Sequence, residues 1–276
     1  MGNVLKVARK EFAEITGNPA FLVAVAVYIL LIILMVKIDV DGFQGETSIQ
    51  VIQGMLIHRM SSIYSTWFCI VPVFIGFSCM ASEYGGTLNT LLTKPVYRDT
   101  IINGKLIACL GGILCLNVLA FLFMASLMII LFGGIVVQAL LSMFGTIVVL
   151  FFFSLLYSSI FLLFSMLIGI LIKERSAAFL VCMLMLILIV LIIPTAPFVG
   201  SLSKIFGMVN PAFEAPANRL LTEMMPKIII SNIYMTSMPQ LGWSDYFSVY
   251  AKVLLFIYPL VLLILCYISF LRRDIA

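Results

Sequence analysis

The chain has 276 residues, of which 63% are hydrophobic and 10% are charged, and its formal net charge is +4. Ordinary soluble domains carry roughly 45–50% apolar and about 25% charged residues. Because a soluble fold of this length cannot hide so much apolar surface from water, the composition excludes that class and predicts a protein solvated by lipid.

The first apolar run extends from Ala20 to Val36 and follows Lys6, Arg9 and Lys10. Basic residues before an apolar run are also typical of a signal peptide. This run is long enough to span a bilayer, however, and Lys37 follows it with no small-residue cleavage pattern. We therefore predict a first membrane helix that is retained.

The segment Asn3–Thr16, just before this run, is predicted to be an amphipathic helix. Its apolar and charged residues fall on different faces at helical spacing: Val4, Leu5, Ala8, Phe12 and Ile15 against Lys6, Lys10 and Glu14. This pattern indicates a helix lying in the membrane interface, although a basic flank that only anchors the topology is an alternative. Gly17-Asn18-Pro19 is expected to end it, so residues 1–19 form an element separate from a transmembrane domain over 20–276.

Six stretches are apolar enough and long enough to span a bilayer, which takes about 20 residues. They are Ala20–Val36, Ile63–Ala81, Leu106–Phe132, a span within Ile135–Ile172, Ser176–Val199 and Val253–Leu271. No charged residue occurs from Leu106 to Ile172, which is too long for one crossing. Gly133-Gly134 is the predicted break, and the start of the next stretch, from Gln138 to Gly145, is expected to lie along the membrane surface.

The distribution of lysine and arginine predicts the orientation, because these residues favour the cytoplasm. With the N-terminus inside, ten of the 16 basic residues fall in the short inside segments: Lys6, Arg9, Lys10, Lys94, Arg98, Lys105, Lys173, Arg175, Arg272 and Arg273. Each side holds six of the 12 acidic residues, so the inside has net charge +4 and the outside zero. Both termini of this multi-pass protein are therefore predicted to be cytoplasmic, in the cell membrane.

The residues needed for membrane-embedded catalysis are missing. His58 is the only histidine, which excludes multi-histidine metal sites, and no predicted span has an interior acidic residue. The six cysteines lie inside apolar runs without CxxC spacing and are interpreted as small buried hydrophobes. A Gly-x-x-x-x-Gly-Lys-Ser/Thr phosphate loop is absent as well: Gly104-Lys105 is the nearest match, with Asp99 and Leu106 at the other two required positions. We expect no catalytic residue, no metal and no cofactor in this chain, and ATP hydrolysis, if needed, by another polypeptide.

The predicted cytoplasmic loop 82–105 is longer than a simple connection requires. Leu88, Leu91 and Leu92 form a small apolar face at helical spacing before Pro95, and Asp99 or Thr100 are candidate caps of a second helix. Such a face favours a docking surface for a cytoplasmic partner, and an ordinary basic loop is the alternative.

The predicted outside region 200–252 contains four prolines and several aromatic residues. The aromatic residues favour a membrane-interface belt. An outer gate or a binding surface for an extracytoplasmic partner is the alternative.

Residues of the loop 82–105 resemble the permease subunits of ABC-2 type transporters, with likeness to the NosY-like branch, which is linked to maturation of the copper enzyme nitrous oxide reductase. The resembling residues are Glu83, Gly86-Thr87-Leu88, Leu91-Leu92, Pro95, Arg98 and Gly104-Lys105. The start VARKEFAEITGNPAF is similar to the elbow helix of that family, and FLRRDIA is similar to its C-termini. The resemblance implies an all-α polytopic fold with about six transmembrane helices, the ABC-2 (type V exporter-like) permease fold.

The resemblance also implies a role for the loop and a set of partners. Glu83, Thr87, Leu88, Leu91, Leu92, Pro95 and Arg98 would form the coupling surface for an ATPase. Two permease copies and two ATPase chains would form one exporter in the lipid bilayer, with ATP bound by the partner and no nucleic acid involved. The small residues Gly111, Gly112, Gly145 and Gly169 are candidate packing positions between spans. A lipid-modifying membrane enzyme and a non-transporting structural or sensory subunit are the alternatives.

Overall fold

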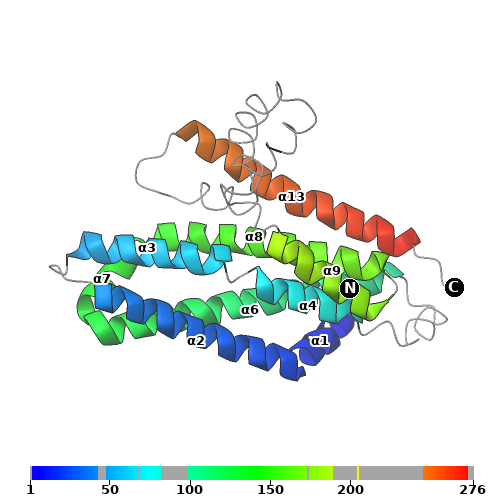
Figure 1. Ribbon diagram of the computed structural model, residues 1–276, viewed down its shortest axis with the longest axis horizontal. Helices are drawn as coiled ribbons and strands as arrows, with labels where there is room; N and C mark the ends of the chain where they lie inside the picture. The colour runs from blue at the N-terminus through cyan, green and yellow to red at the C-terminus, as the bar shows by residue number, and fades with distance from the viewer. Residues whose placement is uncertain are drawn as a thin grey trace.

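The computed structural model describes residues 2–42, 48–66, 69–81, 98–172, 174–188, 204 and 245–272. These residues are all helical, apart from short breaks, and contain no strand. The helices are α1 (Gly2–Gly17), α2 (Pro19–Gly42), α3 (Ile49–Thr66), α4 (Ile70–Ala81), α6 (Arg98–Phe132), α7 (Gly134–Ser142), α8 (Phe144–Leu171), α9 (Arg175–Ile187) and α13 (Asp245–Arg272) (Figure 1).

Among the described residues, four helices are long and apolar enough to cross a membrane. Their apolar stretches are Phe21–Ile38 in α2, Thr100–Phe132 in α6, Phe144–Leu171 in α8 and Val249–Phe270 in α13. They coincide with the predicted first, third, fourth and sixth spans. The predicted fifth span begins as α9, and its remainder lies outside the described residues.

The predicted second span differs from the structure in where it starts. Instead of one helix from Ile63, the chain forms α3 from Ile49 to Thr66 and then α4 from Ile70 to Ala81. Helix α3 therefore occupies much of a segment to which the sequence assigned no helix. Ile52, Leu56 and Met60 lie one turn apart on α3, and all three are at most 1% exposed. This buried face explains why a stretch with several polar residues still packs as a helix.

The predicted break between the third and fourth spans is confirmed. Helix α6 ends at Phe132, and Gly133 adopts a positive φ of 71°, which a residue with a side chain rarely tolerates. The short helix α7 follows and ends at Ser142, and only Met143 separates it from α8. Gln53 of α3 donates a hydrogen bond of 2.8 Å to the Ser142 hydroxyl at the end of α7, which joins α7 to α3.

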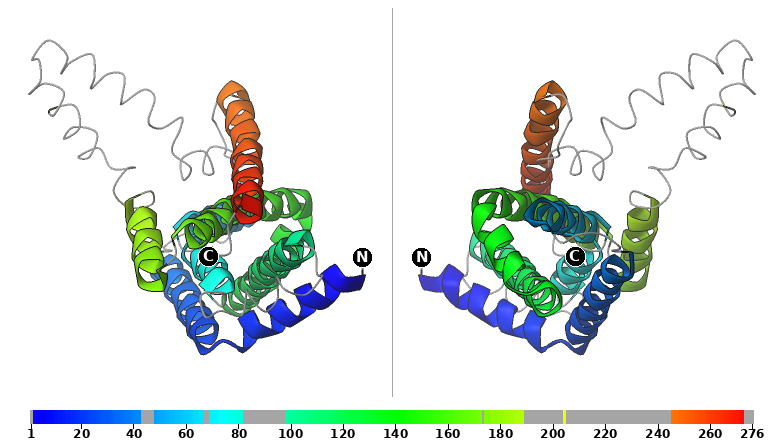
Figure 2. Two further views of the ribbon diagram at one scale, coloured as in Figure 1. Left: turned by 90° about the vertical axis from the view of Figure 1, so that its right-hand side faces the viewer. Right: turned by 90° about the vertical axis from the view of Figure 1, so that its left-hand side faces the viewer.

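The helices form an elongated bundle, and α1 lies across one end of it (Figures 1 and 2). We call this the α1 end. The end of α4, the start of α6 and the end of α8 meet here, as the contacts of Met80 with Gly169 and of Lys105 with Cys79 show. The Cys266 thiol of α13 donates a 3.1 Å hydrogen bond to the Leu163 carbonyl, so α13 runs alongside α8 towards the same end. Both the first helix and the last helix therefore place their terminal residues at the α1 end.

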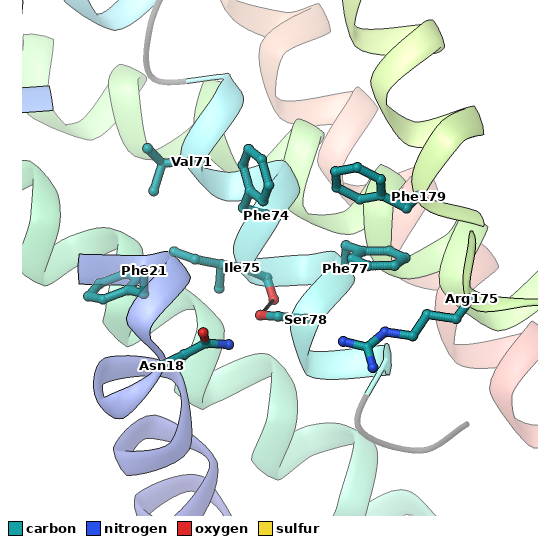
Figure 3. A pocket seen from close by; sticks show the side chains of 9 residues that line it. All are labelled: Asn18, Phe21, Val71, Phe74, Ile75, Phe77, Ser78, Arg175 and Phe179. Carbon is teal, nitrogen blue, oxygen red and sulfur yellow. Dashed lines mark hydrogen bonds between the residues drawn. The ribbon is translucent and has the colours of Figure 1, made fainter. Parts of the chain in front are cut away.

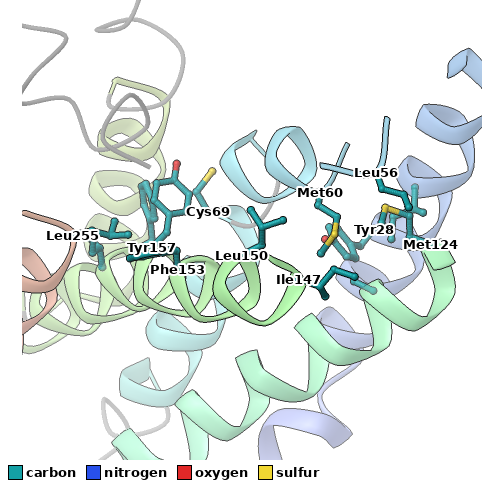
Figure 4. Close-up of a cluster of buried hydrophobic side chains, with 14 of the residues drawn as sticks. Tyr28, Leu56, Met60, Cys69, Met124, Ile147, Leu150, Phe153, Tyr157 and Leu255 are labelled. Atoms are coloured by element: carbon teal, nitrogen blue, oxygen red, sulfur yellow. The ribbon is translucent and has the colours of Figure 1, made fainter. Parts of the chain in front are cut away.

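Helix α8 runs through the apolar core (Figure 4). Its residues Leu150 and Tyr157 are fully buried, and they share one cluster with Tyr28 of α2, Leu56 of α3 and Leu255 of α13. The buried hydroxyls of Ser154 and Ser165 on α8 each donate to a carbonyl three residues earlier, at 2.7 and 2.8 Å. Donation to the same helix removes the penalty of a polar group in an apolar interior.

Two glycines allow α4 and α8 to approach closely. A Cβ on Gly76 would stand 2.6 Å from the Leu162 carbonyl oxygen, and one on Gly169 would stand 2.8 Å from Met80 Cβ. Only a glycine fits such distances without a shift of the helices. Gly169 was among the predicted packing positions, whereas a Cβ on Gly112 or Gly145 would meet nothing within 4 Å among the described residues.

Candidate functional site

The predicted coupling loop lies between two described helix ends. Helix α4 ends at Ala81 and α6 begins at Arg98, so residues 98–105 belong to the first turns of α6 and not to a loop. Arg98 is the first residue of α6. The other predicted coupling residues lie outside the described residues: Glu83, Thr87, Leu88, Leu91, Leu92 and Pro95. Their role stays a prediction, while α4 and α6 carry the two ends of the segment.

A buried ion pair joins α1 to α6 at this place. Lys105 Nζ lies 3.1 Å from Glu11 Oε2, and the two side chains are 3% and 12% exposed. In the sequence Lys105 is a charge of the predicted loop 82–105, and Glu11 stands out by no motif. A signal for Glu11 was present, because it lies three residues after Ala8 and four before Ile15, two buried positions of α1.

Lys105 also binds the last turn of α4. Its Nζ donates a 2.8 Å hydrogen bond to the carbonyl oxygen of Cys79, two residues before α4 ends. Carbonyls in the last turn of a helix lack partners within the helix and carry partial negative charge, so a lysine is a favourable partner there. One ammonium group therefore connects α1, α4 and α6. We call Glu11, Cys79 and Lys105 the three-helix network.

Close packing holds α1 along α6 on either side of the ion pair. A Cβ on Gly104 would stand 2.6 Å from Val7 Cγ1 and 3.3 Å from the Ala8 amide nitrogen. Two turns farther into the bundle, a Cβ on Gly111 would stand 3.9 Å from the Phe12 ring, which is ordinary contact distance. The absence of a side chain at Gly104 lets the two helices approach closely enough for Glu11 and Lys105 to meet.

The charged residues of α1 divide between two environments. Lys10 and Glu14 form an ion pair of 3.3 Å on the outer surface, where their side chains are 69% and 51% exposed. Leu5, predicted to be on the apolar face, is 63% exposed. The buried side of α1 is formed by Ala8, Glu11 and Ile15, so Ala8 and Ile15 of the predicted apolar face pack on the bundle while Leu5 does not.

The three-helix network joins α4 and α6, the two helices that flank the segment 82–97 in the chain, to α1. Cys79 precedes this segment on α4, Lys105 follows it on α6, and Glu11 ties both to α1. Each interaction is short and largely shielded from water, so one ammonium group links the three helices. The arrangement suits mechanical transmission. The described residues contain no group of three or more His, Cys, Asp or Glu side chains that could hold a metal ion.

Five of the six cysteines are buried, as their apolar sequence context predicts. Cys115 differs, because it lies on the exposed surface of α6. Neighbouring residues such as Leu114 and Leu119 are also exposed, so this surface of α6 is an apolar one suited to lipid.

The family model described as "ABC-2 family transporter protein" matches residues 5–275, which is almost the whole chain. The match begins within α1 and continues beyond the end of α13, and it therefore includes every residue of the three-helix network. No curated protein matches the chain.

Proposed function

We propose that this chain, which belongs to the ABC-2 family of transporter proteins and is a permease component, exports a substrate across the cell membrane. The energy would come from a separate ATPase. In this proposal two copies of the chain form the pathway and two ATP-binding-cassette chains dock on their cytoplasmic side. The α1 end is the cytoplasmic end, and the segment 82–97 is the docking surface.

The three-helix network is the observation that carries the proposal. A subunit driven by a partner needs a rigid connection between the docking surface and the membrane helices. Lys105 supplies that connection through 3.1 Å and 2.8 Å contacts to α1 and α4. Closure of the ATPase dimer on ATP would displace the segment 82–97, and α4, α6 and α1 would then move as one unit and change access to the pathway.

The surroundings of Lys105 also support a separate ATPase. Gly104-Lys105 is the nearest sequence match to a phosphate-binding loop, but Lys105 is 2% exposed and already engaged by a carboxylate and a carbonyl. A phosphate-binding lysine is instead presented to its ligand by a loop before a helix. These residues serve helix packing, so ATP is expected to bind to the partner chain.

Substitutions in the segment 82–97 test the docking proposal. We expect Leu91→Asp to abolish co-purification of the ATP-binding-cassette ATPase and ATPase stimulation, because a buried leucine contributes roughly 1.5–3 kcal/mol to an apolar contact. Leu202→Asp is the matched control, since it makes the same change in the predicted outside region. Size-exclusion profiles and thermal stability in nanodiscs report separately whether each permease remains folded.

The outcomes separate the proposal from its alternatives. If Leu91→Asp retains its ATPase but yields an unstable permease, the leucines pack inside the permease and the docking proposal is wrong. If the wild-type chain in nanodiscs neither binds nor stimulates an ATP-binding-cassette ATPase, a non-transporting subunit or a lipid-modifying enzyme explains the fold better.

A further inference from the structure

A cavity of about 230 Å³ lies at the α1 end, and its lining residue Ser78 is the chain neighbour of Cys79 in the three-helix network. It is lined by the junction of α1 with α2, by α4 and by the first turns of α9 (Figure 3). Its walls are largely aromatic and come from three helices: Phe21, Phe74, Phe77 and Phe179. Its polar lining groups are Asn18, Ser78 and Arg175.

The polar groups all belong to the outer end of the cavity. Asn18 is the single residue between α1 and α2, Arg175 is the first residue of α9, and Ser78 precedes the end of α4 by three residues. Val71 and Phe74 line the cavity from positions earlier in α4, which lie deeper in the bundle. Polarity therefore decreases with depth, as it does along a lipid from its headgroup to its acyl chain.

Arg175 supplies a positive charge to this outer end. Its guanidinium group points from α9 towards the end of α4, beneath the Phe77 ring (Figure 3). Within the described part of the chain, no side chain forms an ion pair with Arg175. The neighbouring Glu174 carboxylate accepts a 2.9 Å hydrogen bond from the Ser176 hydroxyl and does not line the cavity. A planar guanidinium group is well suited to bind a phosphate through paired hydrogen bonds.

The aromatic wall is preformed. The Phe179 ring lies 5.2 Å from the Phe77 ring and 5.8 Å from the Phe74 ring, measured between centroids, so α9 and α4 are held together at the cavity. At about 230 Å³ the cavity is smaller than the roughly 300–1,000 Å³ that encloses a whole drug-sized molecule. It fits a headgroup region and the upper part of a chain whose remainder stays in the bilayer.

We propose that this cavity binds an anionic phospholipid from the membrane leaflet at the α1 end, with its phosphate on Arg175 and its upper acyl chain against the four phenylalanines. The proposal does not depend on the identity of the substrate or of the ATPase. Charge complementarity favours an anionic lipid over a zwitterionic one, because the guanidinium group has no described counter-ion and the lipid carries a net negative charge.

The test compares lipids retained by the purified full chain. The permease is equilibrated in mild detergent with equal parts of phosphatidylglycerol and phosphatidylcholine, and native mass spectrometry measures the ratio of the lipids that stay bound. We expect enrichment of phosphatidylglycerol in the wild type and about a fivefold lower enrichment in Arg175→Gln. Arg272→Gln is the matched control, since Arg272 is an exposed arginine at the end of α13. A second variant, Phe77→Ala, is expected to reduce retention of both lipids.

Several results would overturn the proposal. Equal retention of both lipids by the wild type, or equal effects of Arg175→Gln and Arg272→Gln, would show that Arg175 does not select an anionic lipid. Full displacement of phosphatidylglycerol by glycerol phosphate would identify a site for soluble phosphate compounds. A change of oligomeric state in Arg175→Gln with unchanged lipid retention would assign this surface to a second copy of the chain. Since Arg175 is exposed, the variant is expected to keep the wild-type size-exclusion profile.

Discussion

Replacement of Lys105 by methionine tests whether the three-helix network holds α1, α4 and α6 together. Lys105→Met removes the charge and keeps the length of the side chain, and it leaves the Glu11 carboxylate, 12% exposed, without its cationic partner. Removal of one partner from a buried ion pair typically costs about 3–5 kcal/mol. Glu11→Met is expected to cost less, because Lys105 keeps its 2.8 Å hydrogen bond to the Cys79 carbonyl.

The double variant Glu11→Met with Lys105→Met distinguishes a charge effect from a packing effect. It leaves no buried charge, and an apolar pair in place of a buried ion pair is often neutral for stability. Its remaining cost is the lost hydrogen bond to the Cys79 carbonyl, about 1 kcal/mol. We therefore expect the double variant to be more stable than Lys105→Met alone. Additive single losses would instead make it less stable than either single variant.

The free energy of unfolding is measured by titration of the purified permease with dodecyl sulfate in mixed micelles, followed by circular dichroism. Lys10→Met is the control, because it breaks the exposed ion pair of the same helix, and it should cost less than about 0.5 kcal/mol. The reasoning is refuted if Lys105→Met is as stable as Lys10→Met, or if the double variant loses the sum of the two single losses.

Two further predictions concern orientation and packing. A membrane-impermeant maleimide should label a cysteine placed at Lys173 from the inside and one placed at Trp243 from the outside. The background labelling should be low, because five native cysteines are buried. External labelling at Lys173 would overturn the orientation. Gly76→Ala should destabilise the permease by about 1–3 kcal/mol in the same unfolding measurement, since its Cβ would stand 2.6 Å from the Leu162 carbonyl oxygen. Gly112→Ala should be neutral or stabilising, because its Cβ would meet none of the described residues within 4 Å.

The long apolar helices could be predicted from the sequence because lipid imposes a simple rule. A segment that crosses a bilayer must satisfy its backbone as a helix and present apolar side chains over about 20 residues. The apolar stretches of α2, α6, α8 and α13 obey this rule. The break at Gly133 was also predictable, since two consecutive glycines interrupt an apolar stretch too long for one crossing.

Helix α3 could not be recognised by the same rule. Its buried residues Ile52, Leu56 and Met60 form only one narrow stripe, and polar residues separate them. A search for continuous apolar runs therefore misses helix α3. The four-residue spacing of these side chains is the signal that would have predicted α3, and its partner surface on α7 lies far along the chain.

The three-helix network was out of reach for a related reason. Glu11 and Lys105 are separated by 94 positions, and no local pattern links them. Lys105 was counted as a loop charge because the apolar run starts at Leu106, but α6 begins at Arg98 and carries Lys105 into the packed region. Where a helix extends past its apolar run, a charge near the membrane can be a packing residue.

The burial of this ion pair indicates a role in register more than in stability. A lysine and a glutamate withdrawn from water lose hydration that their attraction only partly restores, and apolar side chains would stabilise the same contact at least as well. An apolar contact, however, tolerates sliding of α1 along α6, whereas the ammonium group of Lys105 meets both Glu11 and the Cys79 carbonyl in one arrangement only. The Glu11–Lys105 pair has no net charge, so it does not change the difference in net charge between the inside and outside segments that orients the chain. We infer that the network fixes how α1, α4 and α6 sit relative to one another at the ends of the segment 82–97, which is the property that a transmitting element requires.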